Sequence, residues 1–192
     1  MPLLVLASTS PYRRELLERL LLPFSIAAPD VDETPLQGEL PAQTATRLAQ
    51  AKALKVGSQW PRALIIGCDQ VAALDGTRLG KPHTRENAFK QLQLMCGKTA
   101  EFYTAVCLLN TTTGQTQTKV VHNQVRFRRL SDSQIGNYLD KERAFNCAGG
   151  AKLEGLGIAL IAAVHGEDPW ALIGLPLIAL VEMLKNEGVD PL

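Results

Sequence analysis

The stretch ALIIGCDQVAAL, residues 63–74, has the strongest influence on the predicted fold. Apart from Asp69 and Gln70 its side chains are small or apolar, which is typical of a strand buried near the centre of a sheet. The following pair, Asp75-Gly76, favours a turn. Asp69 is therefore an acid within or at the end of a buried strand, where apolar neighbours raise a carboxyl pKa unless a cation or donor compensates.

Two interpretations of Asp69 are open from this stretch alone. The carboxylate could bind a divalent metal, act as a general base toward water, or do both. It could instead cap a turn or pair with a structural arginine.

The flanking sequence alternates between predicted strands and helices. Apolar runs and helical periodicity predict strands at 3–7 and 24–28, helices at 11–21, 41–58 and 84–97, a hairpin of 98–110 and 115–129, a helix at 131–141, a strand at 157–164 and a last helix at 176–185. This order predicts an α/β fold with a mixed central sheet flanked by helices. Ligands bind such sheets beyond the carboxyl ends of strands. Three polar clusters fall there: residues 8–14, residues 69–70 and the loop 148–155.

Composition excludes several classes of protein. The 192 residues suffice for one core or for two lobes sharing a cleft, and we expect a single domain over residues 1–192. Lys plus Arg number 20 against 19 Asp plus Glu, so no global field attracts nucleic acid. No apolar stretch approaches the roughly 20 residues that span a bilayer. Without a signal-type N-terminus, and with four scattered cysteines, the chain is expected to be cytoplasmic.

Metal preference can also be predicted. Only three histidines are present, and no C-x-x-C pair occurs, which disfavours a zinc site. A metal here would be held by carboxylates and by a substrate's phosphates, which suits Mg²⁺ or Mn²⁺.

The stretch ASTSPYRREL, residues 7–16, predicts an unusual helix start. Ser10 is a good N-cap and Pro11 a good first helical residue, which leaves Arg13 and Arg14 in a first turn where positive charge is unfavourable. A bound phosphate would compensate. The alternative is that these arginines pair with Glu15 and Glu18 on the helix surface.

Three further charged residues allow a functional and a structural interpretation. Lys52 is crowded by alanines on the apolar side of its helix, where it could serve a site or extend its ammonium to solvent. Lys81, in a constrained Gly-Lys-Pro loop, could contact a phosphate or be solvated. Glu33 lies in the acidic loop PDVDETP, and such loops are usually solvated.

No single motif identifies the chemistry. Neither a P-loop nor a dinucleotide-binding glycine pattern is present. The combined set is more informative, because it contains the groups that phosphoryl transfer requires. Its anion-binding candidates are Arg13, Arg14, Lys52 and Lys81, and its metal or base candidates are Asp32, Glu33 and Asp69.

The sequence resembles the Maf family of nucleoside triphosphate pyrophosphatases almost from end to end. The blocks that carry the resemblance are LASTSPYRRELL, PDVDET, RLAQAKA, IIGCDQV, LGKP, FYTAV, CAGGAKLEGLG and IGLPLIAL, in the family's order and spacing. The resemblance implies an α/β fold of two lobes around an active-site cleft, a divalent metal and a homodimer. It also implies hydrolysis between the α and β phosphates to a nucleoside monophosphate and pyrophosphate.

The same resemblance implies residue roles. Ser8 and Arg13 would bind phosphate. Glu33 and Asp69 would serve the metal and the attacking water, with Asp69 as the general base. Lys52 and Lys81 would neutralise the polyphosphate as charge moves toward the leaving group.

Substrate preference is predicted from three positions. The branch that hydrolyses dTTP and UTP typically has Arg, Thr and Gln where this chain has Tyr12, Gln70 and Glu154. The chain is more similar to the branch that hydrolyses 7-methyl-GTP, which has an aromatic residue, Gln and Glu there. A Glu carboxylate can accept from guanine, and Gln can supply either a donor or an acceptor.

Tyr12 is a departure, because this branch usually has Trp, the better platform for a cationic base. The alternatives are a dTTP or UTP pyrophosphatase of the same family, and a nucleotide-binding regulator of cell division with little turnover.

Overall fold

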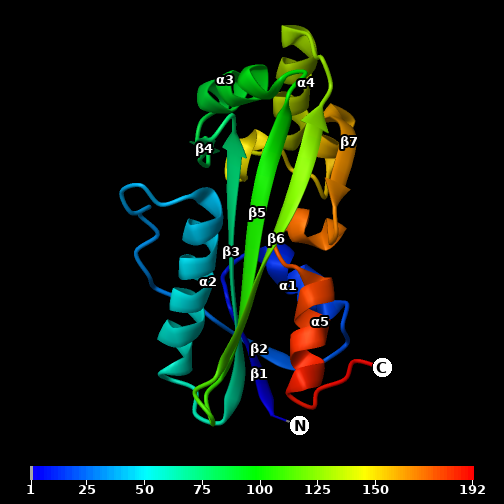
Figure 1. The fold of residues 1–192 in the computed structure, drawn as a ribbon. Coiled ribbons are helices and arrows are strands. Elements are labelled where there is room, and N and C mark those ends of the chain that lie inside the picture. Colours follow the sequence, from blue (N-terminus) through cyan, green and yellow to red (C-terminus); the bar gives the residue numbers. More distant parts are fainter. Residues whose placement is uncertain (1) are drawn as a thin grey trace. The chain divides into compact units, whose positions relative to one another are not determined.

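A computed structural model describes residues 2–192 of the chain, and Figure 1 shows the arrangement of its elements. The strands are β1 (Leu3–Ala7), β2 (Phe24–Ala27), β3 (Ala63–Leu74), β4 (Thr77–Leu79), β5 (Thr99–Asn110), β6 (Thr116–Phe127) and β7 (Ile161–Gly166). The helices are α1 (Pro11–Glu18), α2 (Pro41–Gly57), α3 (Arg85–Met95), α4 (Asp132–Glu142) and α5 (Leu177–Asn186). There are also three short 3₁₀ helices between α4 and α5 in the described residues: η1 (Ala148–Gly150), η2 (Leu156–Leu160) and η3 (Pro169–Ile173).

The strands form one mixed sheet in the order β2-β1-β3-β5-β6-β7, with β4 paired to β3. β1 pairs in parallel with both β2 and β3, whereas β3–β4 and β6–β7 are antiparallel. The predicted α/β class with a mixed, helix-flanked sheet is therefore confirmed, and β3 is an internal strand as expected.

The chain divides into two compact units. The first contains the chain up to Gln70 together with Tyr103–Val121 and Asp168–Leu192, and the second contains Val71–Phe102 and His122–Glu167. The predicted cleft, and the single domain over residues 1–192, stay predictions.

The first unit has the layers of an α/β sandwich, with α2 on one side of the strands and α1 and α5 on the other (Figure 1). Its main hydrophobic core lies on the α1 and α5 side. Leu4 and Leu6 of β1 and Leu64 and Ile66 of β3 point there, as the period of two along a strand requires.

Helix α2 packs closely against the opposite face of β3 at Gly67. A Cβ atom on Gly67 would lie 2.1 Å from the Ala49 carbonyl oxygen and 2.9 Å from the Ala53 Cβ. Glycine is therefore required at this strand position, because only a missing side chain lets the helix backbone approach so closely.

The second unit packs α3 against α4 and against the glycine-rich segment at η1. Gly149 and Gly150 both have positive φ, and Gly150 lies against Ala88 of α3. Tyr138 of α4 holds the same segment, because its hydroxyl donates to the Gly150 carbonyl and accepts from the Lys152 amide.

The local signals at helix ends and turns are confirmed. Ser10, Thr84 and Ser131 each accept a backbone amide as N-caps, and Ser131 forms the predicted capping box with Gln134. Asp75-Gly76 forms the turn between β3 and β4.

Two predicted elements are wrong in part. The strand predicted at 157–164 begins only at Ile161, because residues 156–160 form η2, whose turn is closed by bonds from the Gly157 amide to the Lys152 carbonyl and from the Ile158 amide to the Gly155 carbonyl. The first helix ends at Glu18 rather than at residue 21, where Leu21 has a positive φ.

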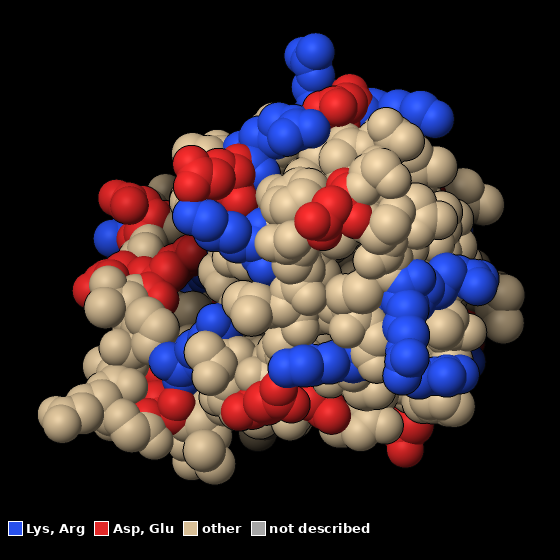
Figure 2. Space-filling view, turned by 90° about the horizontal axis from the view of Figure 1, so that it is seen from above, with Lys and Arg blue, Asp and Glu red and all other residues tan. Residues whose placement is uncertain are grey.

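Within residues 2–192 no helix is long and apolar enough to cross a membrane. On the face shown in Figure 2 both basic and acidic side chains occur, as the balanced charge composition predicts.

Candidate active site

β3 presents Asp69 and Gln70 to opposite faces of the sheet. Asp69 lies on the α2 side with Gly67, and Gln70 lies on the other side with Cys68. The parallel register aligns Ala7 of β1 with Gly67, so Ser8 follows β1 at the level of Cys68. Two of the three predicted polar clusters therefore meet where the β1–β3 pairing ends. Asp69 and Gln70 nevertheless lie within β3 and not beyond its carboxyl end, because the strand continues to Leu74.

On the α2 side, Lys52 joins both predicted carboxylates. Its Nζ lies 2.7 Å from Asp69 Oδ1 and 2.6 Å from Glu33 Oε1. The Lys52 side chain is only 5% exposed and that of Asp69 10%, whereas Glu33 is 57% exposed. The alternative of a solvent-extended Lys52 is therefore wrong, because the ammonium lies in the protein between two carboxylates.

The electrostatics of Asp69 reflect this burial. Desolvation raises the pKa of the Asp69 carboxyl, and the Lys52 and Arg13 charges oppose the rise. Glu33 adds a smaller contribution that raises the pKa of Asp69 further. A carboxylate with a raised pKa beside two cations is suited to accept a proton from a bound water.

The acidic loop that carries Glu33 is tied to α2 by an ion pair. Glu39 accepts from Arg47 Nε at 2.6 Å and from Arg47 Nη2 at 2.9 Å, and the same Nη2 donates to the Thr34 carbonyl. Thr44 donates its hydroxyl to Glu39 as well. Because Thr34 follows Glu33 directly, this bidentate pair restrains the loop beside the site.

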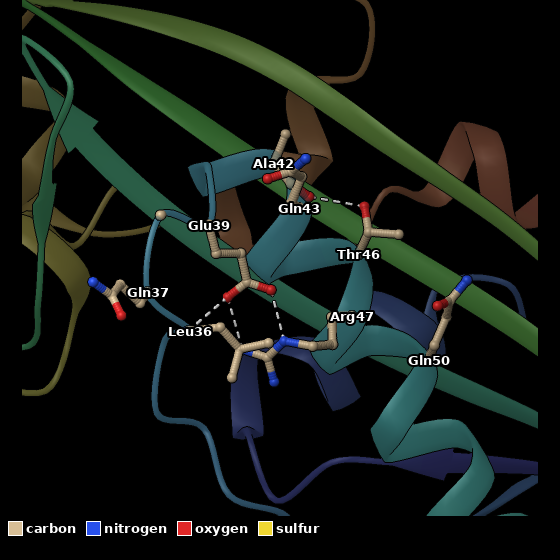
Figure 3. Close-up of a pocket in the computed structure, with 9 residues that line it drawn as sticks. Leu36, Gln37, Glu39, Ala42, Gln43, Thr46, Arg47 and Gln50 are labelled. Carbon is tan, nitrogen blue, oxygen red and sulfur yellow. Dashed lines mark hydrogen bonds and ion pairs between the residues drawn. The ribbon is translucent and has the colours of Figure 1, made fainter.

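A pocket of about 590 Å³ adjoins this ion pair, and Figure 3 shows Glu39 and Arg47 facing each other in it. Its lining residues come from the end of the acidic loop and the first turns of α2: Leu36, Gln37, Gly38, Glu39, Ala42, Gln43, Thr46, Arg47 and Gln50. None of the predicted site residues lines it, so we do not assign it as the substrate site.

On the other side of β3, Arg13 is held by the loop that follows η3. Arg13 Nε donates to the Gly174 carbonyl at 2.9 Å, and the Cys68 thiol donates to the same oxygen. Among residues 2–192 no group bonds to the terminal guanidinium nitrogens of Arg13. Those terminal nitrogens are therefore available to hydrogen-bond a ligand.

The neighbouring residues of α1 have different partners. Arg14 pairs with Glu18 at 2.8 Å, so the surface pairing that the sequence left open applies to Arg14 and not to Arg13. Ser8 is 4% exposed, and its hydroxyl oxygen accepts from the Ser10 amide. Tyr12 is half-buried.

Gln70 has three partners that sequence reasoning missed. Its Nε2 donates to Thr104 Oγ1 at 3.0 Å, to the Ala171 carbonyl at 2.8 Å and to the Leu172 carbonyl at 3.2 Å. Thr104 lies in FYTAV, one of the blocks that carry the Maf resemblance, whereas Ala171 and Leu172 directly precede another of them, IGLPLIAL. That position in the sequence was the only signal that could have pointed to them.

Lys81 and Glu154 belong to the second unit, and both are exposed. Lys81 lies between β4 and α3, and Glu154 lies in the loop between η1 and η2. The Gly149 amide donates to the Gly80 carbonyl, which joins the segment before Lys81 to the glycine-rich loop. Of the nine predicted site residues, the other seven lie in the first unit.

The protein supplies only some of the oxygen ligands that a hard divalent cation such as Mg²⁺ needs. No cluster of three or more His, Cys, Asp or Glu suited to a metal occurs in residues 2–192. Glu33 and Asp69 nevertheless converge on one point, because both contact Lys52 Nζ. Two carboxylates completed by phosphate oxygens are a typical Mg²⁺ environment.

The Maf-like protein family matches residues 3–187, and the chain belongs to this family. A Methylobacillus flagellatus protein named 7-methyl-GTP pyrophosphatase is 60% identical to it, over 99% of each chain. Proteins of the same name from Nitrosospira multiformis and Nitrosococcus oceani are 59% and 55% identical, over 97% of this chain and 94% of theirs.

Among solved structures, the Staphylococcus aureus Ham1 protein matches 65% of this chain and 71% of its own, with 16% identity and a TM-score of 0.43.

Proposed function

We propose that this protein hydrolyses 7-methyl-GTP between its α and β phosphates, giving 7-methyl-GMP and pyrophosphate. The observation that carries the proposal is the buried Lys52–Asp69 pair, with Glu33 on the same ammonium and the Arg13 charge acting on Asp69. The names of the relatives support the substrate.

In the proposed reaction Asp69 takes a proton from water, whose oxygen attacks phosphorus at the α–β bridge. The bond between that phosphorus and the bridging oxygen breaks, and the nucleotide divides into a monophosphate and pyrophosphate. The rise in the pKa of Asp69 caused by burial makes this carboxylate a stronger base than an exposed aspartate.

The cations would bind and neutralise the triphosphate. Ser8 offers a hydroxyl, Arg13 its terminal guanidinium nitrogens, and Lys52 and Lys81 point charges. These groups would stabilise the negative charge that builds up on the departing pyrophosphate.

Glu33 and Asp69 would hold Mg²⁺ or Mn²⁺ together with phosphate oxygens of the substrate. A divalent ion there would withdraw charge from the phosphates and favour the deprotonated form of nearby water. Removal of divalent metal by a chelator is expected to abolish pyrophosphate release, and added Mg²⁺ or Mn²⁺ should restore it.

Tyr12, Gln70 and Glu154 would recognise the base. N7 methylation makes guanine cationic, which favours an aromatic face and a carboxylate near it. A tyrosine ring is a weaker platform for a cationic base than a tryptophan ring would be, so the preference for the methylated base should be modest.

The test is a panel of 7-methyl-GTP, GTP, dTTP and UTP with Mg²⁺ or Mn²⁺, in which pyrophosphate and orthophosphate are both measured. The expected result is pyrophosphate, released fastest from 7-methyl-GTP. A higher rate with dTTP or UTP would reassign the substrate, and orthophosphate would refute the assigned bond. No product from any nucleotide would favour a binding regulator.

A cytoplasmic location and a homodimer complete the proposal. The scattered cysteines support the first. Sedimentation at several protein concentrations tests the second.

A further inference from the structure

The amide of Gln70 lies among acceptors. Nε2 is 2.8 Å from the Ala171 oxygen and 3.2 Å from the Leu172 oxygen, and backbone carbonyls only accept hydrogen bonds. The third neighbour, Thr104 Oγ1, donates its one hydrogen to the Ala171 oxygen at 2.9 Å and so presents only lone pairs to Gln70.

This environment allows only one orientation of the carboxamide. A flipped Gln70 would place its oxygen against two carbonyl oxygens and a hydroxyl whose proton is already used. In that orientation the Gln70 oxygen would face three acceptors, make no hydrogen bond with any of them and be repelled by their lone pairs. The Gln70 nitrogen must therefore face Thr104 and η3, and no residue of the chain from 2 to 192 contributes a hydrogen bond to its oxygen.

We propose that Thr104 is a positioning residue that fixes Gln70 as a hydrogen-bond acceptor toward the base of the substrate. This inference rests on the proposed function and makes it more specific. The sequence left open whether Gln70 donates or accepts, and the Thr104 and η3 network leaves only Oε1 for a ligand.

The consequence is a defined base chemistry. Guanine carries donors at N1–H and at the 2-amino group, which match an acceptor, whereas adenine has an acceptor at N1 and no amino group at C2. Thr104 is fully buried, so it acts through Gln70 and does not contact the nucleotide.

The test compares Thr104→Val, which removes the hydroxyl at nearly constant shape, with Thr104→Ser, which keeps it. The KM for 7-methyl-GTP is expected to rise about fivefold to tenfold in Thr104→Val, the effect of one misplaced hydrogen bond, and to stay near the wild-type value in Thr104→Ser. Inorganic tripolyphosphate, a competitive ligand without a base, should keep its Ki in both variants.

A purely structural role would raise the KM for 7-methyl-GTP and the Ki for tripolyphosphate together, and that result would overturn the proposal. An unchanged KM would overturn it as well. Thermal unfolding shows whether Thr104→Val is folded.

A second variant, Gln70→Met, tests whether Thr104 acts through Gln70, and part of this test does not require Thr104→Val to fold. Gln70→Met removes the acceptor, and Thr104→Val should then add no further rise in KM, whereas independent effects would multiply. Should Thr104→Val not fold, a Gln70→Met protein that binds 7-methyl-GTP as well as the wild type would refute the acceptor role.

If the wild-type protein hydrolyses no triphosphate, the proposed function fails separately. The inference is then tested by calorimetric binding of 7-methyl-GMP against ribose 5-phosphate. Thr104→Val should weaken only the ligand that carries the base, and equal effects on both would overturn the inference.

Discussion

The two faces of β3 differ in how they hold adjacent residues. Asp69 faces α2 in a buried charged group with Lys52, whereas Gln70 faces η3 in a neutral network of carbonyls and one hydroxyl. On the charged side, burial and the neighbouring cations set the pKa of the Asp69 carboxyl. On the neutral side, the hydrogen bonds fix which way the side-chain amide of Gln70 points. In the proposed function, one strand would therefore place reaction chemistry on one face and base recognition on the other, because consecutive side chains point to opposite faces.

The charged face is tested most directly by Asp69→Asn, for which the largest effect is expected. Turnover should fall about 10²-fold to 10⁴-fold, because the amide cannot accept the proton of the attacking water. Nucleotide binding should remain largely intact, as equilibrium binding of 7-methyl-GTP would measure. A variant with wild-type kcat would remove Asp69 from the mechanism.

Gly67→Ala tests the packing beneath the charged face. The new Cβ would lie 2.1 Å from the Ala49 oxygen, so α2 must move away, at a cost of about 3 kcal/mol in the free energy of unfolding. Denaturant unfolding measures the loss. Gly80→Ala is the matched control, since nothing lies within 4 Å of a Cβ there; equal stability of the two variants would contradict the close approach of α2.

Gly174→Ala tests the neutral face. Its φ of +123° strains any residue with a side chain, which should cost about 1–2 kcal/mol in the free energy of unfolding. Moving its carbonyl would also release Arg13 and raise the KM for the triphosphate. Gly188→Ala is the matched control, because Gly188 also has a positive φ but no atom lies within 4 Å of the added Cβ. This control should lose stability without a change in KM. A KM that stays constant in Gly174→Ala would show that this carbonyl does not position Arg13.

The smallest effect is expected at the ion pair that restrains the acidic loop. Arg47 lowers the pKa of Glu39 to about 2, so folding favours the ionised carboxylate. Its stabilising contribution is present above the ordinary value near 4.5 and is lost as pH falls from there toward 2. Over this window the Tm of the wild type should approach that of Glu39→Gln. A Tm difference between the wild type and Glu39→Gln that stays constant from pH 7 to pH 2.5 would contradict this assignment.

Much of the fold could be predicted, because its signals are local. The apolar run at 63–74 identified the internal strand, and the caps at Ser10, Thr84 and Ser131 identified helix starts. The strand expected at 157–164 was wrong over its first half. Its apolar side chains are compatible with a strand, but the close turn at Gly157 depends on the Lys152 carbonyl, which periodicity does not reveal.

The site could be predicted as a set of residues but not as an arrangement. Lys52, Asp69 and Glu33 were candidates, yet the sequence could not distinguish a buried Lys52 from a solvent-extended one. Arg13 and Arg14 looked equivalent, and only their partners separate them: Gly174 for the first and Glu18 for the second.

The sequence by itself determined which chemical groups this protein has, where its helices begin, and its family. Those properties depend on residue type and on neighbours a few positions away. Only the tertiary structure decided that Lys52 joins two carboxylates and that Thr104, 34 residues beyond Gln70, leaves that amide as an acceptor. The direction of a hydrogen bond depends on what surrounds both of its atoms, and folding brings those surroundings from distant parts of the chain.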